Sequence, residues 1–148
     1  MRAVVTRVKE ASVTIDGQVT ARIGKGFLIL LGIHKNDTEK EAAYVADRIC
    51  GLRVFDDEQG KMNINPKDAG ADLLIVSQFT LYADVRSRRP DFFHAARPEK
   101  AIPLYEKVIG DCEKAGFHVE TGEFGAVMEV ASVNDGPVTI IVEKENEQ

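Results

Sequence analysis

The chain has 148 residues, of which 44% are hydrophobic and 29% are charged. These proportions are those of an ordinary globular protein, and they exclude a disordered tail, a collagen-like repeat and a coiled coil. The formal net charge of −5 argues against a domain that coats nucleic acid through a strongly basic face, although it permits a small local contact with phosphates. We expect one domain over residues 1–148, long enough to bury a hydrophobic core.

β-branched residues and alternating apolar positions predict strands in the first third of the chain. These strands cover residues 3–8, 11–15 and 18–23, and Asp16-Gly17 between the last two is a strong signal for a tight hairpin. The continuous apolar run at 27–31 suits a strand that is buried on both faces.

A helix is predicted after these strands. Thr38 and Glu41 have the spacing of a capping box, apolar residues recur behind them at helical spacing, and Gly51 is well placed as the stop. A short strand is expected at 52–55, and the acidic segment 56–60 is interpreted as a solvated turn.

The second half of the chain begins with a predicted strand at 72–76. The later segment 84–98 is interpreted as a functional loop, because Pro90 interrupts it and it carries Arg86, Arg88, Arg89 and Arg97. A second helix is predicted from Pro98, and Pro103 conflicts with that helix unless it starts or bends there. Closing strands are expected at 119–121, 126–133 and 138–142, and residues 134–137 separate the last two.

Together these elements predict an α+β fold. Short hairpins favour a mostly antiparallel sheet that is curled toward a barrel and flanked by two main helices. The chain has neither the regular βαβ alternation nor the glycine fingerprint of a dinucleotide-binding fold.

The N-terminus and the apolar runs predict no membrane partner. The first residues become charged again at Arg7, too soon for a signal peptide. The longest apolar run, 27–33, is far too short to cross a bilayer. We therefore expect a cytoplasmic protein.

Cysteine and histidine spacing predicts no metal ion and no cofactor. Cys50 and Cys112 belong to no CxxC pattern, so we expect two reduced thiols that serve as small apolar residues. The histidines at 34, 94 and 118 are scattered, and the one in the arginine-rich loop is either a surface residue or a phosphate contact. A Ser-His-Asp triad has no support, because neither Ser77 nor Thr80 lies in a G-x-S-x-G elbow.

Two segments carry stronger signals. Ser77-Gln78-Phe79-Thr80 places polar and aromatic residues where an apolar strand ends, which is a rigid place for ligand-binding groups, although a strand that merely ends in polar residues is the alternative. The segment Asn134–Thr139 is either an ordinary hairpin turn or a special one, since a Gly-Pro bond can adopt cis and glycine lets a ligand approach the backbone.

Taken together, these segments resemble the two signature motifs of the D-aminoacyl-tRNA deacylases. The motifs are Ser77-Gln78-Phe79-Thr80-Leu81 and Asn134-Asp135-Gly136-Pro137-Val138-Thr139, and the resemblance also includes residues 2–8, residues 122–128 and the overall length. It implies a homodimeric enzyme that hydrolyses the ester between a D-amino acid and the 3′ terminal adenosine of tRNA. It also implies activity on glycyl esters, because glycine has no side chain to reject.

The resemblance assigns roles to individual residues. Gly136 and Pro137 would form a cis dipeptide that reaches into the partner's pocket and leaves no room for an L side chain, and Arg7 would orient that dipeptide. Adenosine and the ester would be bound by a strip of four residues, with two more near the adenine: Ser77, Gln78, Phe79 and Thr80, then Phe124 and Met128.

The chemistry agrees with these roles. A backbone N–H near Phe79 or Thr80 is the natural donor to the oxyanion, because an ester needs a polarised carbonyl. No strong general base is present among the motif residues, which fits the family view that the substrate's own ribose 2′-hydroxyl assists hydrolysis.

Two other functions remain open from the sequence. One is a module that binds RNA ends without catalysis. The other is a relative that edits a different mischarged amino acid, such as L-alanyl-tRNA, in which the Gly136-Pro137 bond would be trans. The arginine-rich loop is either a phosphate contact for the tRNA or a solvated charged loop.

Overall fold

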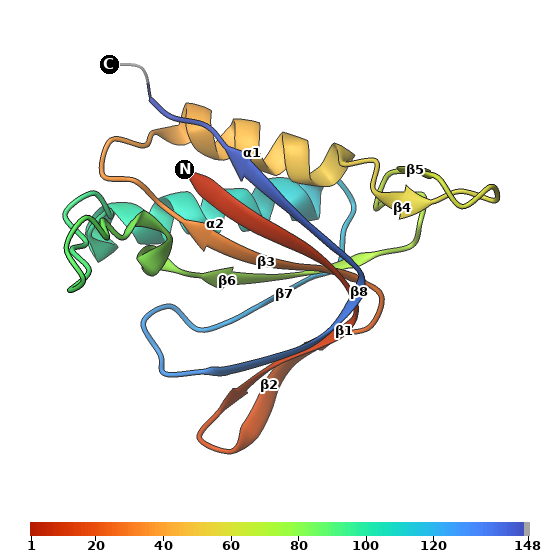
Figure 1. Cartoon of the computed structure of the whole chain (residues 1–148), viewed down its shortest axis with the longest axis horizontal. Coiled ribbons are helices and arrows are strands. Elements are labelled where there is room, and N and C mark those ends of the chain that lie inside the picture. The colour runs from red at the N-terminus through yellow and green to blue at the C-terminus, as the bar shows by residue number, and fades with distance from the viewer. Residues whose placement is uncertain (147–148) are drawn as a thin grey trace.

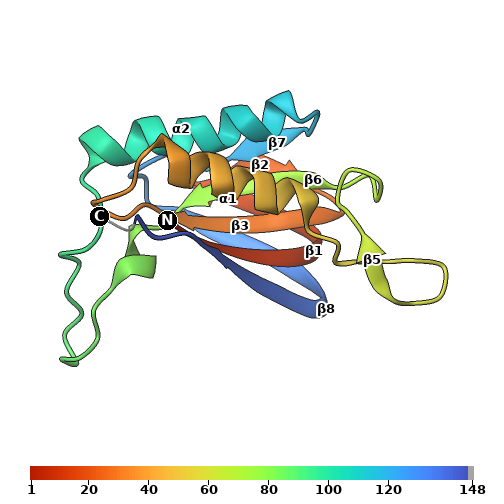
Figure 2. The same cartoon turned by 90° about the horizontal axis from the view of Figure 1, so that it is seen from above.

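The computed structural model describes residues 1–146 and shows a curled sheet with two helices packed on one face (Figure 1). The helices lie side by side above the sheet (Figure 2). The elements are β1 (Arg2–Ile15), β2 (Gln18–Ile23), β3 (Gly26–Gly32), α1 (Glu39–Gly51), β4 (Phe55–Asp56), β5 (Met62–Ile64), β6 (Asp72–Ser77), the 3₁₀ turn η1 (Phe79–Tyr82), α2 (Pro98–Lys114), β7 (Val119–Thr121) and β8 (Glu129–Glu143). No helix among the described residues is long and apolar enough to cross a membrane.

Strand β1 organises the sheet. Its first half pairs with β3 and its second half with β2, while β8 pairs along its other edge, and all three pairings are antiparallel. Two parallel pairings, β3 with β6 and β6 with β7, extend the sheet beneath the helices. Along one edge, β1 pairs first with β3 and then with β2. It bends between these two partners, and the sheet curls into a nearly closed barrel. The predicted α+β class is confirmed.

Apolar residues form two clusters, one on each face of the curled sheet. The larger cluster fills the space between the sheet and the helices and includes Phe27, Ile49, Leu73 and Val108. The smaller one lies inside the curl and joins residues of β1, β2, β3 and β6. The run predicted to be buried on both faces therefore contributes to both clusters, as Phe27 and Leu28 point to opposite sides.

Local signals place the helix ends and the first hairpin. Thr38 and Glu41 form the predicted capping box, and α1 ends at Gly51. Helix α2 starts at Pro98 and continues through Pro103, which lies in its second turn. Positive φ angles at Asp16 (51°) and Gly17 (78°) give the β1–β2 hairpin the backbone twist that favours a two-residue turn.

Three sequence predictions of strands need correction. The expected strands at 3–8 and 11–15 are one strand, β1, and residues 52–54 are not a strand, since β4 is only Phe55–Asp56. The expected strands at 126–133 and 138–142 are likewise one strand, β8, which begins only at Glu129 and contains residues 134–137. Residues 134–137 face β1 between Thr6 and Glu10, where the register of the pairing is irregular. The segment predicted as a turn therefore forms a bulge within one long strand pairing.

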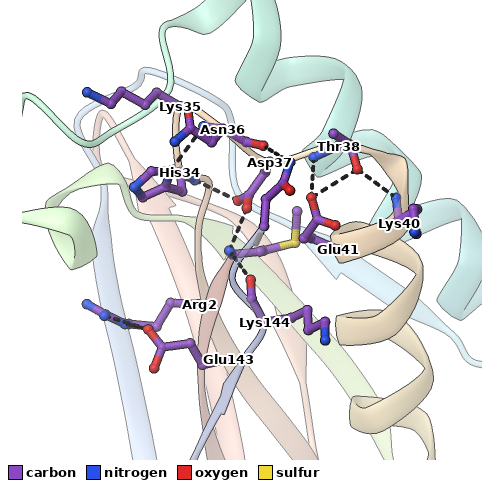
Figure 3. Close-up of polar contacts among 12 residues, drawn as sticks. Arg2, His34, Lys35, Asn36, Asp37, Thr38, Lys40, Glu41, Glu143 and Lys144 are labelled. Carbon is purple, nitrogen blue, oxygen red and sulfur yellow. Dashed lines mark hydrogen bonds and ion pairs between the residues drawn. The ribbon is translucent and has the colours of Figure 1, made fainter. Parts of the chain in front are cut away.

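The N-terminal ammonium group ties three parts of the chain together (Figure 3). It donates to the Asp37 carboxylate at 2.8 Å and to the Lys144 carbonyl at 2.7 Å. The other oxygen of Asp37 accepts from the backbone N–H of His34 at 2.7 Å. These bonds connect the start of β1, the segment after β8 and the loop between β3 and α1.

Candidate functional site

The first motif lies where strand β6 ends and the chain turns. Strand β6 stops at Ser77, and the N–H of Gln78 donates to the Leu31 carbonyl at 2.8 Å before η1 begins. Gly32 makes this turn possible, because a Cβ there would lie 3.0 Å from Leu81 Cβ and 3.1 Å from the Gln78 carbonyl oxygen. The sheet thus holds the motif by backbone contacts that a larger residue at position 32 would disturb.

A pocket of about 290 Å³ opens beside this turn. It is lined by Val76, Ser77, Gln78, Phe79, Phe124, Gly125, Ala126, Met128 and Val130. Five of the residues predicted for substrate binding or catalysis therefore meet in one pocket, although two segments some fifty residues apart supply them. The lining is apolar and aromatic with a few polar groups, which is the usual composition of a small-molecule site.

The polar groups of the pocket are neutral hydrogen-bonding groups. No lining residue carries a carboxylate or an imidazole, so none is a strong general base. The side-chain amide of Gln78 donates to the hydroxyl of Thr80. Within residues 1–146, the backbone N–H groups of Phe79 and Thr80 have no acceptor, as is usual for the first turn of a helical segment. These two amides are available to a ligand oxygen.

Helix α2 supports the pocket from behind. The Tyr105 hydroxyl donates to the Ile75 carbonyl on β6 at 2.8 Å, and its ring lies 6.2 Å from the Phe124 ring. Burial raises the pKa of Tyr105 to about 12, so the hydroxyl remains a donor at neutral pH. Tyr105 thus bonds to β6 next to the pocket strip and lies near Phe124 of the pocket lining.

The second motif lies on β8 around the buried side chain of Arg7. The Gly136-Pro137 peptide bond is cis, and both residues are exposed. Arg7 donates to the Asp135 carbonyl at 3.1 Å and to the Val54 carbonyl at 2.7 Å. A Cβ on Gly136, whose φ is +124°, would lie 3.1 Å from an Arg7 guanidinium nitrogen. Arg7 therefore packs directly beneath the dipeptide.

Two carboxylates compensate the buried charge of Arg7. Asp56 lies 3.5 Å from the guanidinium group and Asp135 lies 3.4 Å from it. The sequence interpretation missed Asp56, which it assigned to a solvated turn, and it missed the Val54 carbonyl. Both reach Arg7 across more than forty residues of chain, so no local pattern could reveal these contacts.

The structure leaves the two motifs in separate places on one chain. The pocket lining does not include Arg7, Gly136 or Pro137. Thr80 does not line it either, but it is bonded to Gln78, which does. The dipeptide lies on an exposed stretch of β8 that also carries the exposed apolar residues Val130, Val133 and Ile141.

The arginine-rich loop, residues 84–98, projects away from the sheet and the helices (Figure 2). A pair of backbone hydrogen bonds between Asp84 and Asp91 closes its tip, where residues 86–90 are exposed. The ring of Phe92 packs edge-on against Phe79 at 5.1 Å, so the loop contacts the pocket strip directly. Arg86 forms an ion pair with Asp84 and lowers the pKa of that carboxyl to about 2. No group of three or more potential metal ligands occurs in the described part of the chain.

Comparisons with known proteins identify relatives of this chain. A family model described as D-Tyr-tRNA(Tyr) deacylase matches residues 4–143. The D-aminoacyl-tRNA deacylase of Brevibacillus brevis is 56% identical over 144 residues, covering 97% of this chain and 99% of that protein. The protein of the same name from Thermus aquaticus is 55% identical over 144 residues, covering 97% and 95%.

Two solved structures share the fold. One, named c-Myc DNA Unwinding Element Binding Protein, has a TM-score of 0.93 and 41% identity and covers 99% of this chain and 100% of that chain. The other, a probable eukaryotic D-amino acid tRNA deacylase, has a TM-score of 0.83 at 14% identity, with 95% and 97% covered, and shows similarity of fold.

These matches place the chain among the deacylase enzymes. Within that class, the chain belongs to the D-Tyr-tRNA(Tyr) deacylase family. The predicted family is confirmed.

Proposed function

We propose that this protein hydrolyses the ester bond of D-aminoacyl-tRNA and releases a free amino acid and tRNA in the cytoplasm. The observation that carries the proposal is the pocket that joins the Ser77–Phe79 strip to Phe124 and Met128. Its aromatic and thioether walls suit a nucleobase, which stacks on apolar side chains. The free N–H groups of Phe79, which lines the pocket, and of the adjacent Thr80 suit an ester carbonyl.

Hydrolysis is proposed to depend on backbone amides and on the substrate itself. The N–H groups of Phe79 and Thr80 would stabilise the negative charge that develops on the ester oxygen. The ribose 2′-hydroxyl beside the ester would assist the attacking water. The absence of a carboxylate or imidazole among the pocket-lining residues supports this substrate-assisted route.

Selection for handedness is proposed to come from a second chain. In a homodimer, Gly136 and Pro137 of one protomer would enter the pocket of its partner, and their backbone carbonyls would exclude an L side chain. Three features support this arrangement: the dipeptide is exposed, Arg7 packs beneath it, and β8 carries further exposed apolar residues. Such steric exclusion ignores the identity of the side chain, and it also admits glycine.

Paired stereoisomers test the proposal most directly. The pure protein is incubated with D-tyrosyl-, L-tyrosyl- and glycyl-tRNA at equal concentrations, and loss of the ester is followed over time. We expect rapid hydrolysis of the D-tyrosyl and glycyl esters and none of the L-tyrosyl ester above the spontaneous rate. Equal rates on the two tyrosyl esters would refute chiral selection.

The same assay decides between the other two functions considered from the sequence. A protein that binds tRNA but hydrolyses none of the three esters is an RNA-end-binding module. A protein that hydrolyses L-alanyl-tRNA and leaves D-tyrosyl-tRNA intact is an editing enzyme of different specificity.

We also propose that the arginine-rich loop binds phosphates of the tRNA end. Arg88 and Arg89 lie at the exposed tip, and the loop contacts the pocket through Phe92 and Phe79. A tRNA whose terminal adenosine occupies the pocket would place its preceding phosphates nearby. A contact of this size needs few cations, so it is compatible with the net charge of −5.

The double variant Arg88→Gln/Arg89→Gln tests the loop. We expect KM for D-tyrosyl-tRNA to rise about tenfold and to depend less steeply on salt, with kcat nearly unchanged, because phosphate contacts contribute affinity. Hydrolysis of D-tyrosyl-adenosine, which lacks the other nucleotides, should not change. Lys40→Gln/Lys114→Gln removes the same charge from exposed positions on the two helices and is the control. A KM effect equal to that of the control would show that the loop makes no specific contact.

A further inference from the structure

The two cysteines lie far apart in the sequence but meet between the helices. Cys50 is in the last turn of α1 and Cys112 is near the end of α2. Their sulfur atoms are 3.7 Å apart, although 62 positions separate them along the chain. Both are free thiols. The prediction of two thiols that serve as small apolar residues fits both cysteines, which pack in the larger core cluster, but it did not include their proximity.

We propose that Cys50 and Cys112 form an oxidative modification site, at which peroxide converts the two thiols into a disulfide that links α1 to α2. A disulfide needs sulfur atoms about 2.05 Å apart, so the present distance must shorten by roughly 1.6 Å. Rotation of the two side chains supplies this movement, because each sulfur lies only one bond beyond its Cβ. Helices α1 and α2 already pack against each other, so the further approach that the sulfur atoms need is small.

The two thiols differ in a way that assigns each a role. Cys50 is partly exposed, whereas Cys112 is fully buried. A hydrogen bond with the Cys112 thiol lowers the pKa of Cys50, and the same pairing together with burial raises the pKa of Cys112. Partial burial and the carboxylates of Asp47 and Asp111 act in the opposite direction on the pKa of Cys50, but the hydrogen bond is the larger influence. Cys50 is therefore the residue that an oxidant can reach and that reacts as a thiolate.

The reaction balances with hydrogen peroxide as the oxidant. The Cys50 thiolate attacks one peroxide oxygen, the O–O bond breaks, and Cys50 becomes a sulfenic acid while hydroxide leaves. The Cys112 sulfur then attacks the Cys50 sulfur, the S–O bond breaks, and the proton of the Cys112 thiol leaves with the hydroxyl group as water. The two thiols lose two electrons in total, and peroxide is reduced to water.

The disulfide would act on the helical layer. It would close a long loop of chain and so restrict the unfolded state, which stabilises the fold. In Figures 1 and 2 both helices run in the same direction, and their C-terminal ends lie at the end of the molecule opposite η1. Neither cysteine lines the pocket, and the proposal does not rest on the proposed hydrolysis.

Mass spectrometry of the intact, reduced protein tests the proposal. After treatment with a small excess of hydrogen peroxide, we expect the mass to fall by two hydrogens and both thiols to escape alkylation on denaturation. Digestion without reductant should yield one peptide pair joined through Cys50 and Cys112. The oxidised protein should melt several degrees higher, and dithiothreitol should reverse both changes. Oxygen addition without a cross-link, or a cross-link only between two chains, would overturn the proposal.

Single variants test the order of the two steps. In Cys112→Ala, the sulfenic acid on Cys50 has no thiol to attack it, so dimedone should label Cys50 after peroxide treatment. In folded Cys50→Ala, the buried Cys112 should stay unlabelled under the same conditions. Labelling of Cys112 at the rate of Cys50 would overturn the assigned roles. If Cys112→Ala does not fold, dimedone competition during oxidation of the unmodified protein gives the same information at Cys50.

Discussion

The side chain of Arg7 holds the backbone in place by hydrogen bonds to the Asp135 and Val54 carbonyls. Its guanidinium group is buried, and a buried charge is costly unless carboxylates and hydrogen bonds compensate it. Here two carboxylates approach it and two backbone carbonyls accept from it, one of them at Asp135 beside the dipeptide. Those contacts fix the segment that the second motif occupies. The structure therefore supplies a physical reason for the positioning role that the family resemblance assigns to Arg7.

Thr80 is the residue that a reader of the sequence would choose as a nucleophile, and the structure argues against that role. A threonine hydroxyl is a poor nucleophile at neutral pH without an adjacent base, and its bonded neighbour is the neutral amide of Gln78. We predict that Thr80→Ala lowers kcat/KM for D-tyrosyl-tRNA by about fivefold, the effect of one hydrogen bond of about 1 kcal/mol. Steady-state kinetics measures this change.

Two further measurements separate that hydrogen bond from covalent catalysis. Thr80→Ser keeps the hydroxyl and should retain the full rate. Rapid acid quenching of the unmodified enzyme during turnover should recover no acyl group on the protein. A trapped acyl-Thr80 adduct, or a complete loss of turnover in Thr80→Ala with tRNA binding intact, would establish Thr80 as the nucleophile.

At the scale of elements, sequence signals correctly predicted the helix starts and the hairpin that depend on interactions between neighbouring residues. The capping box at Thr38, the hairpin at Asp16-Gly17 and the helix start at Pro98 depend on neighbouring residues and occur where the sequence placed them. Residues 134–137 carry an equally strong turn signal, yet they lie inside β8. Pairing along the whole of β1 outweighs that local preference, and sequence periodicity does not report such long-range pairing.

Long-range contacts also limited what the sequence could predict about the candidate site. The composition of the Ser77–Thr80 strip indicated a ligand site at a strand end. Family resemblance was needed to associate this strip with Phe124 and Met128. The pocket brings these two residues together with Ser77, Gln78 and Phe79. Neither composition nor family resemblance indicated a role for Asp56. Its contact with Arg7 depends on how the loop after α1 returns to β1, which is a property of the tertiary fold.

The loop between β3 and α1 offers a test of element-level stability. Asp37 and the N-terminal ammonium group are both fully buried and form an ion pair at 2.8 Å (Figure 3). We predict that Asp37→Asn lowers the free energy of unfolding by about 3 kcal/mol, because it leaves a buried cation without its counter-charge. Urea denaturation followed by circular dichroism measures the change.

The matched control removes a carboxylate that is exposed. Glu58 has no ion pair with any residue in 1–146, and Glu58→Gln should change the free energy of unfolding by less than about 0.5 kcal/mol. If Asp37→Asn were as stable as this control, the ion pair would make no net contribution, and the hydrogen bonds alone would hold the chain ends.

At the scale of the whole molecule, the separation of the two motifs requires an explanation. The pocket is bounded by Phe79 and Met128, whereas Gly136 and Pro137 lie exposed on β8 outside it. A two-fold symmetric dimer can bring one motif from each chain together. In such a dimer the same contact is made twice, so the dipeptide of each chain would enter the pocket of the other. The exposed apolar residues on β8 provide a surface that such a dimer would cover.

Mixing two inactive variants tests whether sites are shared. Gly136→Ala introduces a methyl group at a φ of +124° and within 3.1 Å of Arg7, so it should disable the dipeptide without unfolding the domain. Gln78→Ala/Phe79→Ala should disable the strip. Each variant alone is expected to lose more than 90% of the activity, roughly the tenfold effect of 1.4 kcal/mol. After unfolding and refolding together, the mixture should recover roughly a quarter of the unmodified rate per chain. Half of randomly formed dimers are mixed, and each of these holds one intact pocket of two.

Native mass spectrometry with one variant carrying a mass tag counts the mixed dimers in the same sample, so activity can be assigned to them. The control is each variant refolded alone, which should stay inactive. Recovery in proportion to the mixed species means that a strip from one chain works with the dipeptide of the other. Mixed dimers that form and stay inactive would show that both motifs act within one chain. A protein that remains monomeric at assay concentration while hydrolysing D-tyrosyl-tRNA would exclude the shared pocket altogether, because the exposed dipeptide would then have no second pocket to enter.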